Sequence, residues 1–299
     1  MPTARPILIA SDLSQNADRA MARALQLARP GGHPLVAMNA IHEEPLWWVL
    51  KSGDLDPDEL RRDLLREAMA ELRDQVRRSA RQLAVDAPEV DIHARLGNTA
   101  PLVAEIAETR DCGLIVIGAH GRHAVRDWFL GTTAERIVRE SDVPVLVAKA
   151  DPVRAYERVV VAVDFSAPSR AALEAALAWA PDAQFTLVHA YETWFETYID
   201  ESTYERIRQE QETALRDRLR EFAAAAGVTS DQEPVYHIIA GHPGTAVINA
   251  AVDAHADLTV CGTQGATGLR HLVLGSVAQH ILRESSRDVL TVRVPPADA

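Results

Sequence analysis

Short apolar runs alternate along the chain with longer stretches in which apolar residues recur every three or four positions. The short runs suit strands that are buried on both faces, and the longer stretches suit amphipathic helices. The predicted strands are 7–10, 35–41, 90–96, 114–117 and 143–148, then 159–163, 185–191, 236–240, 258–261 and 289–294. The predicted helices are 16–28, 101–109, 168–179 and 246–254, a long charged helix after the second strand of each half, and a last helix from Thr132 or Ser276.

Strands that alternate with helices predict an α/β fold with a doubly wound parallel sheet in each half. The halves also repeat one another, because 97–149 aligns with 241–293 without a gap and 17 of the 53 pairs are identical. A chain of 299 residues has room for two domains of about 150 residues. We therefore expect tandem domains at 1–150 and 155–299, joined by a short linker near Asp151 and Pro152.

The most distinctive repeated motif is Gly-x2-Gly-x9-Gly followed by a small hydroxyl residue. It comprises Gly118, Gly121, Gly131 and Thr132 in the first half, and Gly262, Gly265, Gly275 and Ser276 in the second. A strand that ends in glycines and leads into a helix can offer backbone N–H groups to a phosphate. The motif is not a Walker loop, because no Gly-Lys-Ser/Thr follows the glycines. The motif therefore predicts a phosphate site of another type in each half.

An aspartate follows the first predicted strand of each half, at Asp12 and at Asp164, two positions before a serine. Ligands of doubly wound sheets bind beyond the carboxyl ends of the strands. Asp12 and Gly118 both follow such strand ends, and so do Asp164 and Gly262. The sequence therefore predicts one nucleotide site in each half.

Composition and charge argue against several other classes of protein. The formal net charge is −12, whereas a general nucleic-acid binder needs Lys and Arg to neutralise phosphates. No apolar stretch approaches 18 residues, and the apolar run near Met1 is too short for a signal peptide. Cys112 and Cys261 occupy non-equivalent places in the two halves, which predicts reduced thiols in a cytoplasmic protein.

With the glycine motif and the aspartate in both halves, the chain resembles tandem universal stress proteins over nearly its whole length. The resemblance implies a Rossmann-like fold of the adenine-nucleotide alpha-hydrolase type. It also implies a site for ATP or another adenine nucleotide in each half, with Mg²⁺ on the phosphates as a candidate cofactor. The implied contacts are Ala40 and Ala190 for adenine, and Thr132, Thr133, Ser276 and Val277 for the phosphates.

Three differences between the halves fall near these residues. Gly113, Pro144 and Asn39 of the first half stand where the second half has Asp257, Asp288 and His189. None of them replaces a motif glycine. They therefore bear on the details of the two sites and not on their existence.

Each candidate residue also has a purely structural interpretation. Glycine permits a positive φ and close backbone approach. The pairs Thr132/Glu135 and Ser276/Gln279 fit capping boxes, and a capped helix would still leave N–H groups for a phosphate. The two aspartates could cap the first helix of each half instead of meeting a nucleotide.

Three functions remain open: a non-enzymatic sensor that changes a partner contact when nucleotide binds, a slow ATP hydrolase, and an interaction protein with vestigial sites. Hydrolysis needs a positioned base and charge stabilisation of the leaving phosphate. Arg126 and Arg270 match between the halves, but no base repeats apart from the aspartates, which favours binding over turnover. His120 and His123 lack partners at metal-ligand spacing, so no metal site is expected in the protein itself.

We therefore expect two adenine nucleotides per chain and a protein partner that the sequence does not identify. Neither nucleic acid nor a membrane is an expected partner. The sequence leaves open whether the two halves pair with each other as a pseudo-dimer or the chain forms a homodimer.

Overall fold

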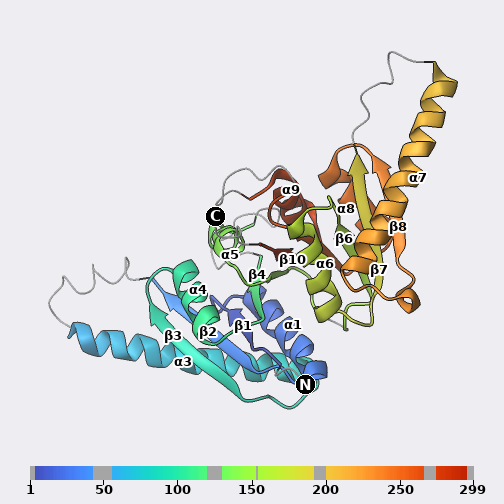
Figure 1. Cartoon of the computed structure of the whole chain (residues 1–299). Coiled ribbons are helices and arrows are strands. Elements are labelled where there is room, and N and C mark those ends of the chain that lie inside the picture. The colour runs from blue at the N-terminus through green and yellow to red at the C-terminus, as the bar shows by residue number, and fades with distance from the viewer. Residues whose placement is uncertain are drawn as a thin grey trace. The chain divides into compact units, whose positions relative to one another are not determined.

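The computed structural model describes residues 4–42, 56–119, 130–152, 154–191, 200–265 and 274–294. The chain divides into two compact units, Met1–Ala155 and Tyr156–Ala299. Each unit repeats the same alternation of strands and helices (Figure 1).

The first unit contains a parallel sheet with the strand order β3-β2-β1-β4-β5. Its strands are β1 (Ile7–Ala10), β2 (Leu35–Ile41), β3 (Val90–Leu96), β4 (Leu114–Gly118) and β5 (Val145–Ala148). Its helices are α1 (Gln15–Gly31), α3 (Pro57–Gln82), α4 (Thr99–Thr109) and α5 (Thr132–Glu140). The strand order reverses between β1 and β4, so the carboxyl ends of these two strands form the switch point at which such sheets bind ligands.

The second unit repeats this order as β8-β7-β6-β9-β10, again with parallel neighbours. Its strands are β6 (Arg158–Ala162), β7 (Gln184–Tyr191), β8 (Val235–Ala240), β9 (Leu258–Gly262) and β10 (Asp288–Val292). Its helices are α6 (Ala167–Trp179), α7 (Glu201–Ala225), α8 (Pro243–Asp253) and α9 (Ser276–Glu284), with a 3-10 turn η1 (Ser230–Gln232) that the sequence pattern did not predict. The predicted fold class, two tandem doubly wound parallel sheets, is confirmed.

The central strands are buried on both faces, as their continuous apolar runs predict. Ile7, Leu8 and Ile9 of β1 have no exposed surface, and the valines of β6 are at most 1% exposed. Among the described helices, none combines the length and the apolar character that crossing a membrane would require.

Two helices begin two or three residues earlier than predicted. α4 begins at Thr99, two residues before the expected start, and α8 begins at Pro243, three residues before it. Proline suits the first turn of a helix, because its fixed φ is already helical and its missing N–H would have had no partner there. Pro101 and Pro243 therefore both fit in the first turn of their helices.

Gly113 of the first half stands where the second half has Asp257, and hydrogen bonds to the backbone explain this difference. The Asp257 carboxylate accepts hydrogen bonds from the N–H groups of Glu157 and Arg158, at 2.9 and 3.1 Å. Pro6 occupies the place of Arg158 in the first unit, since Gly113 N–H donates to Pro6 O as Asp257 N–H donates to Arg158 O. Proline has no N–H, so the first unit lacks the donor that Arg158 provides in the second.

The difference between Pro144 and Asp288 also has a structural explanation. The Tyr156 hydroxyl donates to Asp288 Oδ2 at 2.6 Å, and the two residues are 5% and 0% exposed. A buried carboxylate requires such donors, because its transfer from water is costly.

Tyr156→Phe is expected to lower the free energy of unfolding by about 1–3 kcal/mol, since it leaves a buried carboxylate oxygen without this donor. Urea denaturation monitored by circular dichroism measures the loss. Tyr191→Phe is the matched control, because Tyr191 donates to Glu212, whose side chain is 30% exposed and can be hydrated instead. Equal losses in the two variants would contradict this role for the buried pair.

Candidate functional site

The chain makes the same turn after the first strand of each unit. Asp12 Oδ1 accepts a hydrogen bond from Ser14 N–H at 3.1 Å, and Asp164 Oδ1 accepts one from Ser166 N–H at 3.0 Å. The residue between them has a positive φ in both cases, 63° at Leu13 and 64° at Phe165. Non-glycine residues rarely adopt this conformation, and such strain is concentrated at functional sites.

The serines of these turns are the N-caps of α1 and α6. Ser14 Oγ accepts from Ala17 N–H and Ser166 Oγ accepts from Ser169 N–H, each at 3.3 Å. The interpretation that Asp12 and Asp164 cap these helices is therefore wrong. The aspartates instead fix the turn that precedes each cap, with one carboxylate oxygen directed to the backbone.

In the second unit three candidate residues converge beyond the carboxyl ends of β6 and β9. A Cβ placed on Gly265 would lie 3.1 Å from Asp164 Oδ2. Gly275 N–H donates to Thr263 O at 2.8 Å, and a Cβ on Gly275 would lie 3.3 Å from the same oxygen. The aspartate, the second glycine and the third glycine of the motif therefore share one small region.

The described part of the first unit has the same hydrogen bond from the third glycine. Gly131 N–H donates to Ala119 O at 2.9 Å, as Gly275 does to Thr263. Gly121 lies outside the described residues, as do His120, His123, Arg126 and Arg270.

The last helix of each unit begins without a side-chain cap. Gly131 and Gly275 are the N-caps, with ψ of 146° and 149°, and neither α5 nor α9 has a side-chain capping hydrogen bond. Thr132 and Ser276 are the first helical residues, so the predicted capping boxes are wrong. The hydrogen bonds from the glycines to Ala119 and Thr263 place each helix start one residue earlier than a capping box would.

An uncapped start leaves backbone N–H groups directed out of the helix. In α5 and α9 the first intrahelical bonds are from Glu135 N–H to Gly131 O and from Gln279 N–H to Gly275 O. The three residues before each of these donors lie in the first turn, where an N–H group has no carbonyl partner within the helix. They include Thr132 and Thr133 in α5, and Ser276 and Val277 in α9. Such a helix end attracts an anion through these donors and through the helix dipole.

The first glycine of each motif has a packing role. A Cβ on Gly118 would lie 2.9 Å from Asn16 O, and a Cβ on Gly262 would lie 2.8 Å from Pro168 Cβ. These glycines let the first turns of α1 and α6 approach the ends of β4 and β9. Close approach therefore explains them, whereas positive φ does not, because none of the described motif glycines has one.

Ala40 and Ala190 lie near the carboxyl ends of β2 and β7, one residue before each strand ends. The side chains that precede them make equivalent contacts: Asn39 Nδ2 donates to Ser11 O and His189 Nδ1 donates to Val163 O, each at 2.8 Å. Burial lowers the pKa of His189, which favours its neutral form. The change from asparagine to histidine therefore keeps the contact with the carbonyl that precedes the aspartate.

The sequence matches the model of the Universal stress protein family over residues 3–149 and again over 155–293. The chain belongs to the universal stress protein family. A universal stress protein from Mycobacterium bovis is 25% identical over 212 residues, which are 69% of this chain and 70% of that protein.

A solved structure of the family has the same fold over most of the chain. A universal stress protein from Archaeoglobus fulgidus aligns with 96% of this chain and 98% of its own, with a TM-score of 0.65 and 19% identity. A universal stress protein solved in complex with cAMP is 29% identical and covers 46% of this chain and 97% of its own, with a TM-score of 0.36.

Neither cysteine of this universal stress protein is suited to chemistry at the sites. Cys112 and Cys261 are free, buried thiols, and burial raises their pKa values to about 11 and about 12. Both therefore stay protonated at neutral pH. The described residues hold no group of three or more His, Cys, Asp and Glu side chains that could ligate a metal.

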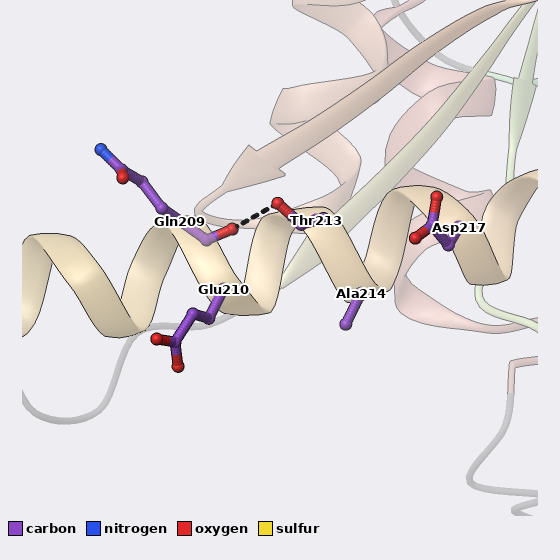
Figure 2. A pocket seen from close by; sticks show the side chains of 5 residues that line it. All are labelled: Gln209, Glu210, Thr213, Ala214 and Asp217. Carbon is purple, nitrogen blue, oxygen red and sulfur yellow. Dashed lines mark hydrogen bonds between the residues drawn. The ribbon is translucent and has the colours of Figure 1, made fainter.

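The hollows on the described surface lie away from the converging residues. One of about 450 Å³ lies along α7, and all five residues that line it are exposed residues of that helix (Figure 2). Its polar groups include Thr213 Oγ1, which donates to Gln209 O at 2.8 Å within the helix. Another, of about 390 Å³, lies beside the end of α1 and the start of β2, at the amino ends of the strands. A groove along one helix offers no convergent polar groups, so we assign it no function.

Proposed function

We propose that this universal stress protein binds one adenine nucleotide in each unit and acts as a nucleotide-dependent regulator of a stress response. The observation that supports this most strongly is the convergence of Asp164, Gly265 and Gly275 at the uncapped start of α9. The turn after β6 and the loop after β9, about a hundred residues apart in sequence, meet at the switch point of the sheet, where ligands of such sheets bind. The sites would lie within domains at 1–150 and 155–299.

In each proposed site the phosphates accept hydrogen bonds from the N–H groups at the helix start. Adenine contacts the backbone at the end of the second strand. The second site would use Asp164, Ala190, Gly262, Gly265, Gly275, Ser276 and Val277. The first would use Asp12, Ala40, Gly118, Gly121, Gly131, Thr132 and Thr133.

Mg²⁺ fits this proposal as a companion of the phosphates. In nucleotide sites the ion is commonly held by one or two carboxylates together with phosphate oxygens and water. Asp164 supplies a carboxylate beside Gly265, and Asp12 is its counterpart in the first unit.

Isothermal titration calorimetry with ATP and Mg²⁺ is expected to give a stoichiometry near two. Ligand binding to the folded state must also raise the melting temperature, and a ligand at 100 times its Kd stabilises by about 2.7 kcal/mol. GTP is the control for base selectivity. No heat and no thermal shift with any adenine nucleotide would overturn the proposal, and a stoichiometry near one would restrict it to one unit.

Release of inorganic phosphate, measured in the same samples, separates a sensor from a hydrolase. A sensor should release phosphate far more slowly than the typical enzyme turnover of about 10 per second. A rate of that order, lost in Asp12→Ala combined with Asp164→Ala, would instead establish an ATP hydrolase.

A further inference from the structure

The two units differ in charge at one matching position beside the proposed sites. Glu71 of α3 comes directly before the buried Leu72, and Arg218 of α7 comes directly before the buried Leu219. In both helices, the residue three positions after this leucine contacts the turn that follows the first strand of its unit. Gln75 and Phe222 make these contacts, Gln75 with Ser11 at 2.7 Å and Phe222 with Phe165 at 5.8 Å between ring centroids.

In the second unit the cation is held beside the site by an aromatic ring. The Arg218 guanidinium carbon lies 4.0 Å from the centroid of the Phe165 ring. The same ring lies 4.5 Å from the His189 ring, centroid to centroid. Phe165 directly follows Asp164, and His189 directly precedes Ala190. Arg218 therefore contacts the residue that follows the aspartate, and the ring of that residue contacts the neighbour of the proposed adenine position.

In the first unit the corresponding contacts are polar and the corresponding charge is negative. Gln75 accepts from Ser11 Oγ and donates to Asp18 Oδ1 at 2.8 Å, where the second unit has aromatic rings. Glu71 pairs with Arg78 at 3.0 Å on the exposed side of α3. Leu13 takes the place of Phe165, so this position itself offers no aromatic face to a cation.

We propose that the two nucleotide sites are unequal, and that Arg218 makes the second unit the tighter site for an anionic adenine nucleotide. This inference rests on the proposed function. A guanidinium attracts a negatively charged ligand, whereas the Glu71 carboxylate, paired with Arg78, offers no such attraction. The cation–π contact with Phe165 holds the charge in place, and among the described residues no ion pair of Arg218 accompanies it. The second site therefore fills first, and it favours ATP over AMP more strongly than the first site does.

Charge exchange at the matching positions tests this directly. One-site proteins are made with Gly131→Val, which leaves the second site, and with Gly275→Val, which leaves the first. In these backgrounds we expect Arg218→Glu to weaken ATP binding to the second site by about tenfold, or about 1.4 kcal/mol. We expect Glu71→Arg to tighten ATP binding to the first site. Both residues are substantially exposed, so circular dichroism should show an unchanged fold.

Two further measurements separate charge from packing. Arg218→Lys keeps the charge but loses the planar stack, and it should bind ATP within about threefold of the parent protein. Arg218→Gln removes the charge without reversing it and should have an intermediate affinity. Added salt should weaken the second site more than the first, because screening acts on the attraction.

The outcomes distinguish this inference from the proposed function. An absence of nucleotide binding in the unmodified chain removes both. Two equal sites that are insensitive to Arg218→Glu and Glu71→Arg overturn the inference and leave the proposed function standing. An affinity of Arg218→Lys as low as that of Arg218→Glu would also overturn it, since Arg218 would then act by packing on Phe165.

Discussion

Gly262→Val is expected to lower the free energy of unfolding of the second unit by about 3 kcal/mol. Its Cβ would lie 2.8 Å from Pro168 Cβ, 3.0 Å from the Pro168 carbonyl carbon and 3.2 Å from Gln264 O. Two of these neighbours are backbone atoms, so relief requires α6 to move away from the end of β9, and overpacking of this kind costs about 1–3 kcal/mol or more. Gly118→Val should act alike in the first unit, because its Cβ would lie 2.9 Å from Asn16 O. Urea denaturation followed by far-UV circular dichroism measures both losses.

Gly275→Ala is the matched control for this experiment. Gly275 has an ordinary φ of −62°, and its Cβ would lie 3.3 Å from Thr263 O, a distance that small shifts can relieve. It should therefore cost less than about 1 kcal/mol. If Gly262→Val were no more costly than this control, close approach would not be the reason for the first glycine of the motif.

Combining Gly131→Val with Gly275→Val is expected to reduce the number of bound adenine nucleotides from two to zero. Each single variant should lose one. These glycines are the N-caps of α5 and α9, and a branched side chain there would occupy the space through which a phosphate reaches the helix N–H groups. Calorimetry gives the stoichiometry, and circular dichroism should show that the helix content persists.

Thr132→Ala and Ser276→Ala provide the control for this second experiment. The hydroxyls of these residues do not cap the helices, and the substitutions leave every backbone N–H in place. Binding should survive in both. Its loss would assign the phosphate contact to the hydroxyls, and normal binding in the double valine variant would place the phosphates elsewhere.

The fold class could be predicted because its signals are local. β1 and β6 are continuous apolar runs, and α1 and α6 follow them directly with a serine at the start. Helix starts were less predictable. The hydrogen bond from Gly275 N–H to Thr263 O, formed across the loop after β9, decides where α9 begins, and no local pattern contains it.

The candidate sites were predicted only in part, for a similar reason. The strand ends predicted that Asp164 and the glycine loop share one edge of the sheet, but not the direct approach of the Asp164 carboxylate to Gly265, since about a hundred residues separate them in sequence. The contact between Arg218 and Phe165 escaped the sequence analysis because it joins α7 to the turn after β6. Comparing the long helices of the two halves position by position could have revealed the charge difference at Glu71 and Arg218.

The hydrogen bonds of Asp257 constrain how the sequence of the second half can evolve. Pro6 occurs with Gly113, and Arg158 occurs with Asp257, because the carboxylate serves N–H groups at the start of β6, one of which proline would remove. A mutation at one member of such a pair changes the selection on the other. The donors are backbone N–H groups, so at position 158 only proline removes one. Across descendants of this gene, proline at position 158 should therefore occur only where position 257 no longer holds aspartate.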